Sequence, residues 1–405
     1  MNKYFSALIY LFVFCIVLAL SKNAERGFIS YDRKRELGIR GCSIKNPFIL
    51  CCIAVMVLSL LAGIRSDEVG VDVGVYITPT YKYIQSGASF NDVLGIFGSF
   101  SVAYTLLAYI TGRLFHSIGL LLFLIQLLTA GPVFLFAYRQ RKTHSMTLII
   151  ATYLFLFYNN SLNSMRQSIS CAFILLSISY LREKNYRNTI ICILLAGTFH
   201  EITLFIALAI VILYFIVYRA RRKWIWISIV LVLIVIGMLN YRTIISAVVY
   251  GIPGLSNNTK ILGYYRTFIL EQNDPTYFFG SFDKSLIFDW LARGCFILFP
   301  LLYTYQRRKV GNEFKLELFM VIISYIVYSI PFFVIRTVYG GRISYPFEWF
   351  YLLYLPRMFS KTGVNLGRNK TTVGRLFFWG IIVFDWFVWI IVFGWSGSNL
   401  LSFRV

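Results

Sequence analysis

The sequence has little charge of either sign, and acidic side chains are especially scarce. Only 14% of its 405 residues are charged, whereas a soluble domain usually carries about a quarter. Hydrophobic residues make up 58%, and apolar runs recur along the whole chain, which leaves no room for a soluble domain of ordinary size. The composition therefore predicts an all-α polytopic membrane protein, with about 12 transmembrane helices in one integral domain over residues 1–405.

Several features that would indicate other kinds of chemistry are missing from the sequence. There is no C-x-x-C pair, and the seven cysteines are scattered, which argues against a disulfide framework or a thiolate metal site. The three histidines lie far apart, and neither a D-x-D motif nor a glycine-rich phosphate loop occurs. If the chain is an enzyme, we expect it to work without a metal, a nucleotide or another cofactor.

Positive charge is present in excess, and it lies in short clusters at the ends of the apolar runs. The formal net charge is +22. The clusters fall at residues 33–35, 139–142, 182–187, 219–223, 307–309 and 361–370. Clusters at such places are typical of the cytoplasmic loops of membrane proteins. The excess charge is therefore interpreted as a membrane topology signal and not as a nucleic-acid surface.

Placing every basic cluster on the cytoplasmic side predicts the direction of each crossing, with both termini outside. The first crossing, residues 4–20, runs inward and is followed by a basic internal loop at 21–46. Residues 65–118 then form an external loop with an interfacial helix, before an inward crossing at 119–138. A second long external loop is expected at 241–285.

Two predicted hairpins, at residues 143–181 and 188–218, each have an arm too short for a full membrane crossing. The second has about 31 residues, although one full crossing needs about 20. Their polar turns, around 159–170 and 197–201, are therefore expected below the outer surface. Non-helical backbone at that depth is tolerated only where it is buried in protein or lines a wet cavity. The sequence thus predicts an outward-facing aqueous pocket.

Charged side chains near this predicted pocket suggest an anionic ligand, for which a lipid-linked diphosphate is the obvious candidate. Arginine holds phosphate through a planar fork and stays charged at any relevant pH. The candidate diphosphate ligands are Arg65, Arg166, Arg336 and Arg342. The candidate proton acceptors are His200, then Glu201, then Asp72, because imidazole titrates near neutral pH. Snorkelling of Arg65 to headgroups and a packing role for His200 remain open alternatives.

One further charged pair has a structural interpretation. Asp289 and Arg293 lie four residues apart within an apolar run, a spacing that places both side chains on one face of a helix. We expect them to pair with each other. Asp385, alone in the last apolar run, is expected to be a hydrogen-bonded structural residue.

Four short motifs follow one another along the chain. They are Arg65, Gly70, Asp72 and Tyr76; Asn163, Arg166, Gln167 and Ile169; Phe199, His200 and Leu204; and Arg342, Ile343 and Tyr345. With these motifs in this order, the chain resembles the EpsG family of Wzy-type bacterial O-antigen and exopolysaccharide polymerases. It departs from the pattern where Val73 replaces an aromatic residue and where Glu201 directly follows the histidine, which leaves the identity of the base open.

The resemblance implies a metal-independent glycosyltransferase of the bacterial cytoplasmic membrane, with a fold similar to class C glycosyltransferases. Such an enzyme transfers a growing glycan from polyprenyl (undecaprenyl) diphosphate to a polyprenyl-diphosphate-linked repeat unit on the outer face. The expected partners are these two lipid-linked oligosaccharides, the bilayer and a separate chain-length regulator, with no nucleic acid. The residues expected to line the substrate-binding site are Asn163, Gln167, Tyr76 and Tyr345.

Three other functions remain as alternatives. A ligase that moves finished glycan to a lipid core would share the substrate and the arginine and histidine chemistry. A flippase or other transporter of lipid-linked sugars often contains inverted repeats with broken helices, but no second copy of the two hairpins occurs later in the chain. A purely structural membrane protein leaves Arg166 and His200 unexplained.

Overall fold

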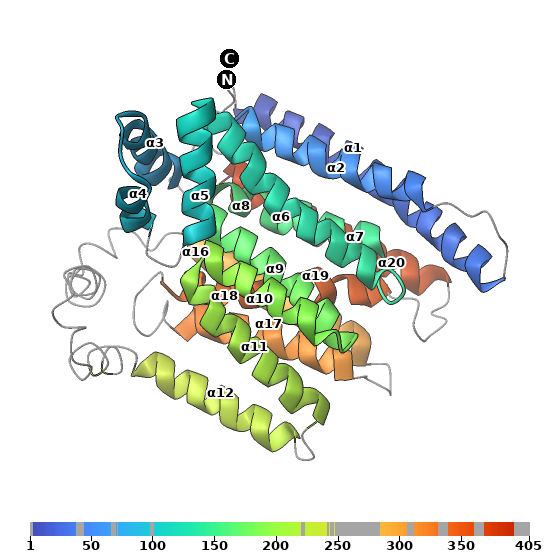
Figure 1. Cartoon of the computed structure of the whole chain (residues 1–405). Helices are drawn as coiled ribbons and strands as arrows, with labels where there is room; N and C mark the ends of the chain where they lie inside the picture. Colours follow the sequence, from blue (N-terminus) through green and yellow to red (C-terminus); the bar gives the residue numbers. More distant parts are fainter. Residues whose placement is uncertain are drawn as a thin grey trace. The chain divides into compact units, whose positions relative to one another are not determined.

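The computed structural model describes most of the chain, and every regular element in the described part is a helix (Figure 1). The described ranges are residues 3–37, 44–65, 72–97, 101–219, 223–240, 284–305, 312–330, 339–359 and 368–392, with a few isolated positions. The all-α prediction is confirmed for these residues. The chain divides into two compact units, Met1–Val211 with Trp349–Val405 and Ile212–Glu348, which are described separately below.

Three described helices are long and apolar enough to cross a membrane. They are α1 (Lys3–Glu36), α2 (Lys45–Gly63) and α6 (Ile118–Gln140). Shorter apolar helices cover Val102–Phe115, Tyr186–Phe199, Thr203–Arg219, Ile225–Gly237 and Leu376–Val392. The chain is thus a multi-pass membrane protein, while the total of about 12 crossings stays a prediction.

Several of the other helices adjoin π-helical turns. The first unit also contains η1 (Val73–Ile77), α3 (Thr78–Gln85), α4 (Phe90–Phe97), α5 (Val102–Ile110), η2 (Thr111–Phe115), α7 (Met146–Thr152), η3 (Tyr153–Tyr158), α8 (Asn159–Asn163), α9 (Met165–Arg182), α10 (Tyr186–Phe199), α19 (Tyr351–Tyr354), η7 (Pro356–Phe359), α20 (Arg368–Trp386) and η8 (Phe387–Val392). From there α11 (Glu201–Arg219) leads into the second unit. That unit contains α12 (Lys223–Leu239), α16 (Lys284–Tyr305), α17 (Asn312–Ile330) and α18 (Tyr339–Glu348).

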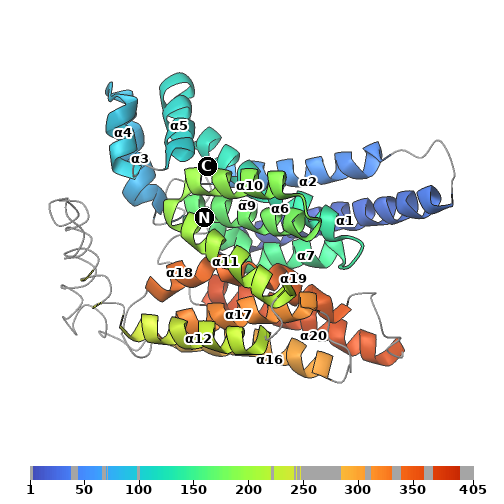
Figure 2. The same cartoon turned by 60° about the horizontal axis from the view of Figure 1, so that its bottom comes forward.

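In the first unit, α1, α2, α6, α9 and α10 lie side by side, and α3, α4 and α5 gather at one end of them (Figures 1 and 2). Nearly all of α9 is buried, including a series of small side chains. Small residues let helix backbones approach closely within a membrane. Ser170 uses this approach, because its hydroxyl donates to the carbonyl of Ala196 on α10 at 2.7 Å. The central position of α9 explains why this apolar helix does not face lipid.

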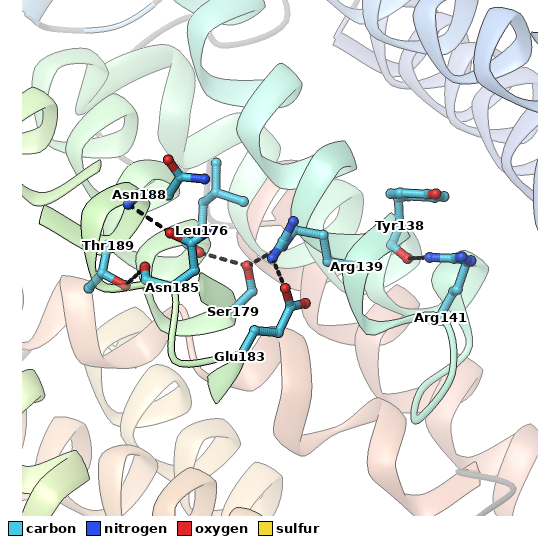
Figure 3. A network of polar contacts seen from close by, with 9 residues as sticks. All are labelled: Tyr138, Arg139, Arg141, Leu176, Ser179, Glu183, Asn185, Asn188 and Thr189. Atoms are coloured by element: carbon cyan, nitrogen blue, oxygen red, sulfur yellow. Dashed lines mark hydrogen bonds and ion pairs between the residues drawn. The ribbon is translucent and has the colours of Figure 1, made fainter. Parts of the chain in front are cut away.

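The basic ends of α6, α9 and α10 are held together by polar contacts (Figure 3). Arg139 on α6 donates to the hydroxyl of Ser179 on α9 at 2.9 Å, and it forms an ion pair with Glu183 just after α9. Its guanidinium also lies 3.8 Å from the ring centroid of Tyr180. The side chain of Asn185 caps α10 by accepting from the amide of Asn188. Together these contacts join the short turn between α9 and α10 to α6.

In each of the two predicted hairpins, the helix is interrupted within the predicted polar turn. In the second hairpin α10 has only 14 residues and ends at Phe199, after which His200 has extended backbone angles (φ −153°, ψ 108°). At about 1.5 Å per residue α10 is about 21 Å long, short of a hydrocarbon core of about 30 Å. In the first hairpin the helix breaks at Ser164 (φ −81°, ψ 53°), and α9 begins at Met165. The short arm and the break at His200 are therefore confirmed, whereas the turn expected at 159–170 is helical except at Ser164.

One predicted boundary is wrong. The internal loop expected at 21–46 begins later, because α1 continues as a helix to Glu36. Lys, Arg, Glu and Ala are good helix formers, and Ala24 and Phe28 extend the buried face of α1 while Arg26 is exposed. The loop predicted at 241–285 lies almost entirely outside the described residues.

A carboxylate in the polar half of α1 binds the first residues of α7. The Glu25 carboxylate accepts from the backbone amides of Met146 and Thr147 at 3.1 Å each, and from the hydroxyls of Ser145 at 3.0 Å and Thr147 at 2.5 Å. The first amides of a helix have no partner within it, and a negative charge is favourable at that end. Glu25 thus acts as a cap supplied by another helix.

Replacing Glu25 with alanine is expected to lower the free energy of unfolding by about 1–2 kcal/mol, the usual cost of losing a helix cap. Urea unfolding of the purified protein in detergent measures this loss. Glu36→Ala, which removes an exposed carboxylate from the same helix, is the matched control and is expected to have little effect. Equal losses in both variants would show that Glu25 does not act as a cap.

Candidate functional site

The first sequence motif contacts the second directly, beginning with Arg65. This residue follows the end of α2 and is only 1% exposed. Its Nη1 donates to the carbonyl oxygen of Leu162 at 2.8 Å, and its Nη2 lies 3.5 Å from Sδ of Met165. Arg65 is therefore not a snorkelling residue. It reaches the break between α8 and α9, nearly one hundred residues further along the chain.

Gly70 and Asp72 continue the same contact. Gly70 has φ +93°, which a side chain would disfavour, and a Cβ there would lie 3.0 Å from the carbonyl oxygen of Leu162. The backbone amide of Asp72 donates to Oδ1 of Asn163 at 3.2 Å. The segment from Arg65 to Asp72 is thus joined to the α8–α9 break by a side chain, a close backbone approach and a backbone amide.

Arg166 lies in the first turn of α9, directly after this break, and is partly buried. Its guanidinium is 5.6 Å from the ring centroid of Tyr104 on α5, within the range of a cation–π contact. The side chain of Tyr104 is itself buried. The sequence did not predict Tyr104, because in a chain with 28 tyrosines nothing separates it from an interfacial aromatic residue.

The third motif reaches the same place through Phe199. Its ring stacks on Phe173 of α9 with centroids 6.3 Å apart. The same buried cluster contains Val73, Ile77, Tyr81, Ile84, Tyr104, Leu121, Ile125, Met165, Ile169 and Phe199, among others. His200 follows at the break between α10 and α11, is partly buried, and its carbonyl accepts from the amide of Thr203 at 3.2 Å. Three of the four motifs therefore meet around one hydrophobic cluster.

Many polar side chains of the first hairpin turn bind other helices. Asn159 accepts from the indole nitrogen of Trp386 on α20 at 2.8 Å. Ser161 donates to Gln126 of α6 at 3.2 Å, and Gln126 in turn donates to the hydroxyl of Tyr153 at 2.7 Å. Buried polar groups are costly unless they are paired. Much of the neutral polar content of this turn is therefore structural, and Arg166 is distinguished by facing Tyr104.

Two further predicted lining residues lie on elements already described. Gln167 is buried in α9, next to Arg166, whereas Tyr76 in η1 is about half exposed. The helix backbone includes Glu201, but its side chain lies outside the described residues, and so does the whole of Arg336. Within the described part of the chain, no three His, Cys, Asp or Glu side chains gather in a way that could hold a metal ion.

The fourth motif lies in the second unit, on α18. Arg342 is exposed there and Tyr345 is buried. The same helix carries Glu348, which accepts from Arg293 of α16 at 2.5 Å and also from the hydroxyl of Ser344. The expected pair of Arg293 with Asp289 is confirmed at 2.8 Å. The sequence indicated this pair but not its third member, Glu348, because the contact joins two helices distant in the chain.

The comparisons with known proteins place the chain in a family. No curated protein and no solved structure matches it, so the similarity to class C glycosyltransferases stays a prediction. The family model described as the EpsG family matches residues 48–403, which include all four motifs. This match supports a polysaccharide polymerase or glycosyltransferase-like function for a multi-pass membrane protein. The chain therefore belongs to the EpsG family.

Proposed function

We propose that the protein is a polysaccharide polymerase at the outer face of the bacterial cytoplasmic membrane. It transfers a growing glycan from polyprenyl diphosphate to a repeat unit carried by a second polyprenyl diphosphate. The observation that carries this proposal is the meeting of three motifs, because Arg166, Asp72 and His200 are each the chain neighbour of a residue in one hydrophobic cluster. Such a transfer requires a cationic group for the diphosphate and one proton acceptor, for which the imidazole and the carboxylate are alternative candidates.

Arg166 is the proposed ligand of the leaving diphosphate. It lies at the N-terminal end of α9, where backbone amides also favour an anion. Arg342 and Arg336 are proposed as further diphosphate ligands. Charge develops on the diphosphate as the glycosidic bond breaks, and a preorganised cation stabilises that charge. Because diphosphate is a weak base, it leaves without a general acid.

The acceptor hydroxyl must lose a proton as it attacks the anomeric carbon. His200 is the first candidate base, since it lies at a helix break and an imidazole exchanges protons near neutral pH. Glu201 is the second and Asp72 the third. One displacement assisted by one base would invert the anomeric centre. Asn163, Gln167, Tyr76 and Tyr345 are proposed to line the path of the sugars.

A strain that lacks the gene tests the function through its surface glycan, resolved on a gel. Wild type is expected to restore a ladder of polymer, and His200→Gln is expected to lower its rate of formation by about 100-fold, a typical contribution of a general base. Glu201→Gln is expected to lose less than about tenfold if His200 is the base. Arg26→Ala removes an exposed cation of α1 and is the control.

Each outcome has a separate meaning. A deletion strain that keeps a single repeat unit on its acceptor, with a ladder restored by wild type, supports polymerisation. Loss of even the single unit in the deletion strain would point to export or to a ligase and would contradict the proposed function. If Glu201→Gln loses activity and His200→Gln does not, polymerisation stands and Glu201 is the base.

A further inference from the structure

We propose that Arg65 does not bind the diphosphate but is a positioning residue, which sets the place of Arg166 by holding the break between α8 and α9. This inference rests on the proposed function, in which Arg166 binds the leaving group. It concerns how the first motif contributes to the site. It departs from the simplest interpretation of the sequence, in which every arginine of the motifs contacts phosphate.

The burial of Arg65 argues against direct contact with a ligand. A guanidinium that belongs to a residue only 1% exposed offers almost no surface to a diphosphate. Its two terminal nitrogens already face protein atoms, with Nη1 2.8 Å from the carbonyl oxygen of Leu162 and Nη2 3.5 Å from Sδ of Met165. The two partner residues flank Ser164, the break that precedes Arg166.

The break needs such a partner. A helix end leaves its last carbonyls without donors among its own amides, and Leu162 lies in the last turn of α8. A buried carbonyl without a donor is destabilising, and a cation near the end of a helix interacts favourably with it. Arg65 supplies both the donor and the charge, so it stabilises the change of direction at Ser164.

Gly70 makes a second contact with the same turn, and this contact involves no charge. Two features require glycine there: its φ of +93°, and the distance of only 3.0 Å that would separate a Cβ from the carbonyl oxygen of Leu162. Next to it, the amide of Asp72 donates to Asn163. A change at Gly70 therefore disturbs the docking without altering any charge that could face the substrate. This separates a positioning role from a ligand role.

The turn determines the position of Arg166. Arg166 directly follows Met165, one of the two partners of Arg65, and its guanidinium lies 5.6 Å from the ring of Tyr104. Because a displacement of about 1 Å in a reacting group can cost about 100-fold in rate, a loosened turn is expected to reduce polymerisation even though Arg166 is intact.

The experiment compares Arg65→Gln, Gly70→Ala, their double variant, and Arg166→Gln, all purified in lipid nanodiscs. Hydrogen exchange of peptides covering residues 159–170 is followed by mass spectrometry. Arg65→Gln and Gly70→Ala are each expected to speed exchange there by about tenfold through local opening, whereas Arg166→Gln is not. Arg113→Gln is the matched control, because Arg113 also donates to a backbone carbonyl, that of Ile84 at 3.1 Å, away from the turn.

The same variants are assayed for polymer formation from lipid-linked repeat units. Arg65→Gln and Gly70→Ala are each expected to be slower by about 10- to 100-fold. The double variant is expected to be slower than the slower single variant by less than about threefold. The effects of two residues that act through one contact do not add. If Arg65→Gln does not accumulate, Arg65→Lys, which keeps the charge but lacks the fork, takes its place and is expected to behave as Gln does.

Two results would overturn the proposal. The first is unchanged hydrogen exchange of residues 159–170 in Arg65→Gln, together with a polymerisation rate in the double variant that equals the product of the two single losses. A direct ligand would give that result. The other is faster exchange in both single variants with normal polymerisation. Failure of the proposed function is distinguishable, because wild type would then make no polymer, while the exchange measurements would still decide whether Arg65 holds the turn.

Discussion

Replacing Arg166 with glutamine is expected to slow polymerisation severely while folded protein remains in the membrane. The guanidinium is partly buried at the start of α9, beside Tyr104 and the docked first motif. Loss of one preorganised group that stabilises developing charge typically lowers the rate by about 100- to 1,000-fold. The measurement is the initial rate of polymer formation from purified lipid-linked repeat units.

The conservative variants sharpen this prediction. Arg166→Lys is expected to recover only a small part of the rate, because an ammonium lacks the planar fork that matches a phosphate. Tyr104→Phe keeps the ring beneath the guanidinium and is expected to retain more activity than Tyr104→Leu, which removes it. Full activity of Arg166→Gln in correctly folded protein would remove this residue from the site.

Replacing Arg293 with methionine is expected to destabilise the second unit severely. Arg293 is paired with Asp289 at 2.8 Å and Glu348 at 2.5 Å, and both carboxylates are only 6% exposed. Its guanidinium also lies 4.2 Å from the ring centroid of Tyr328 on α17. Breaking a buried ion pair from one side typically costs about 3–5 kcal/mol, because the partner charge stays buried without compensation.

Thermal unfolding in detergent, followed by size-exclusion chromatography, measures this effect. The triple variant Asp289→Asn, Arg293→Met and Glu348→Gln is expected to regain much of the lost stability, since it removes the charges together. Arg342→Met is the control, because it removes an exposed arginine from the neighbouring helix α18. Equal destabilisation in the control and in Arg293→Met would show that the buried network is not what joins these helices.

This network also bears on the late motif. Arg293 of α16 reaches Glu348 on α18, and α18 carries Arg342 and Tyr345. A variant that weakens the network is therefore expected to disturb Arg342 as well. For this reason the stability of each variant must be measured before its activity is interpreted.

Several properties were determined by the sequence alone, because they follow from composition and length. Low charge and recurrent apolar runs require a membrane protein. The second hairpin could not contain two full crossings, so a break near His200 was required, and α10 ends there. The pairing of Asp289 with Arg293 follows from helical periodicity. The four motifs likewise identified the family.

Other features were decided only by the tertiary structure. The partner of Arg65 is a backbone carbonyl at Leu162, 97 residues away, and any residue type would present the same oxygen to it. Tyr104 acquires its place beside Arg166 only through the packing of α5 against other helices, among them α10. Local patterns carry information about periodicity, charge and length, but not about which distant backbone atoms come together. Those contacts depend on how the helices pack, and packing made a predicted ligand, Arg65, a buried donor to the turn.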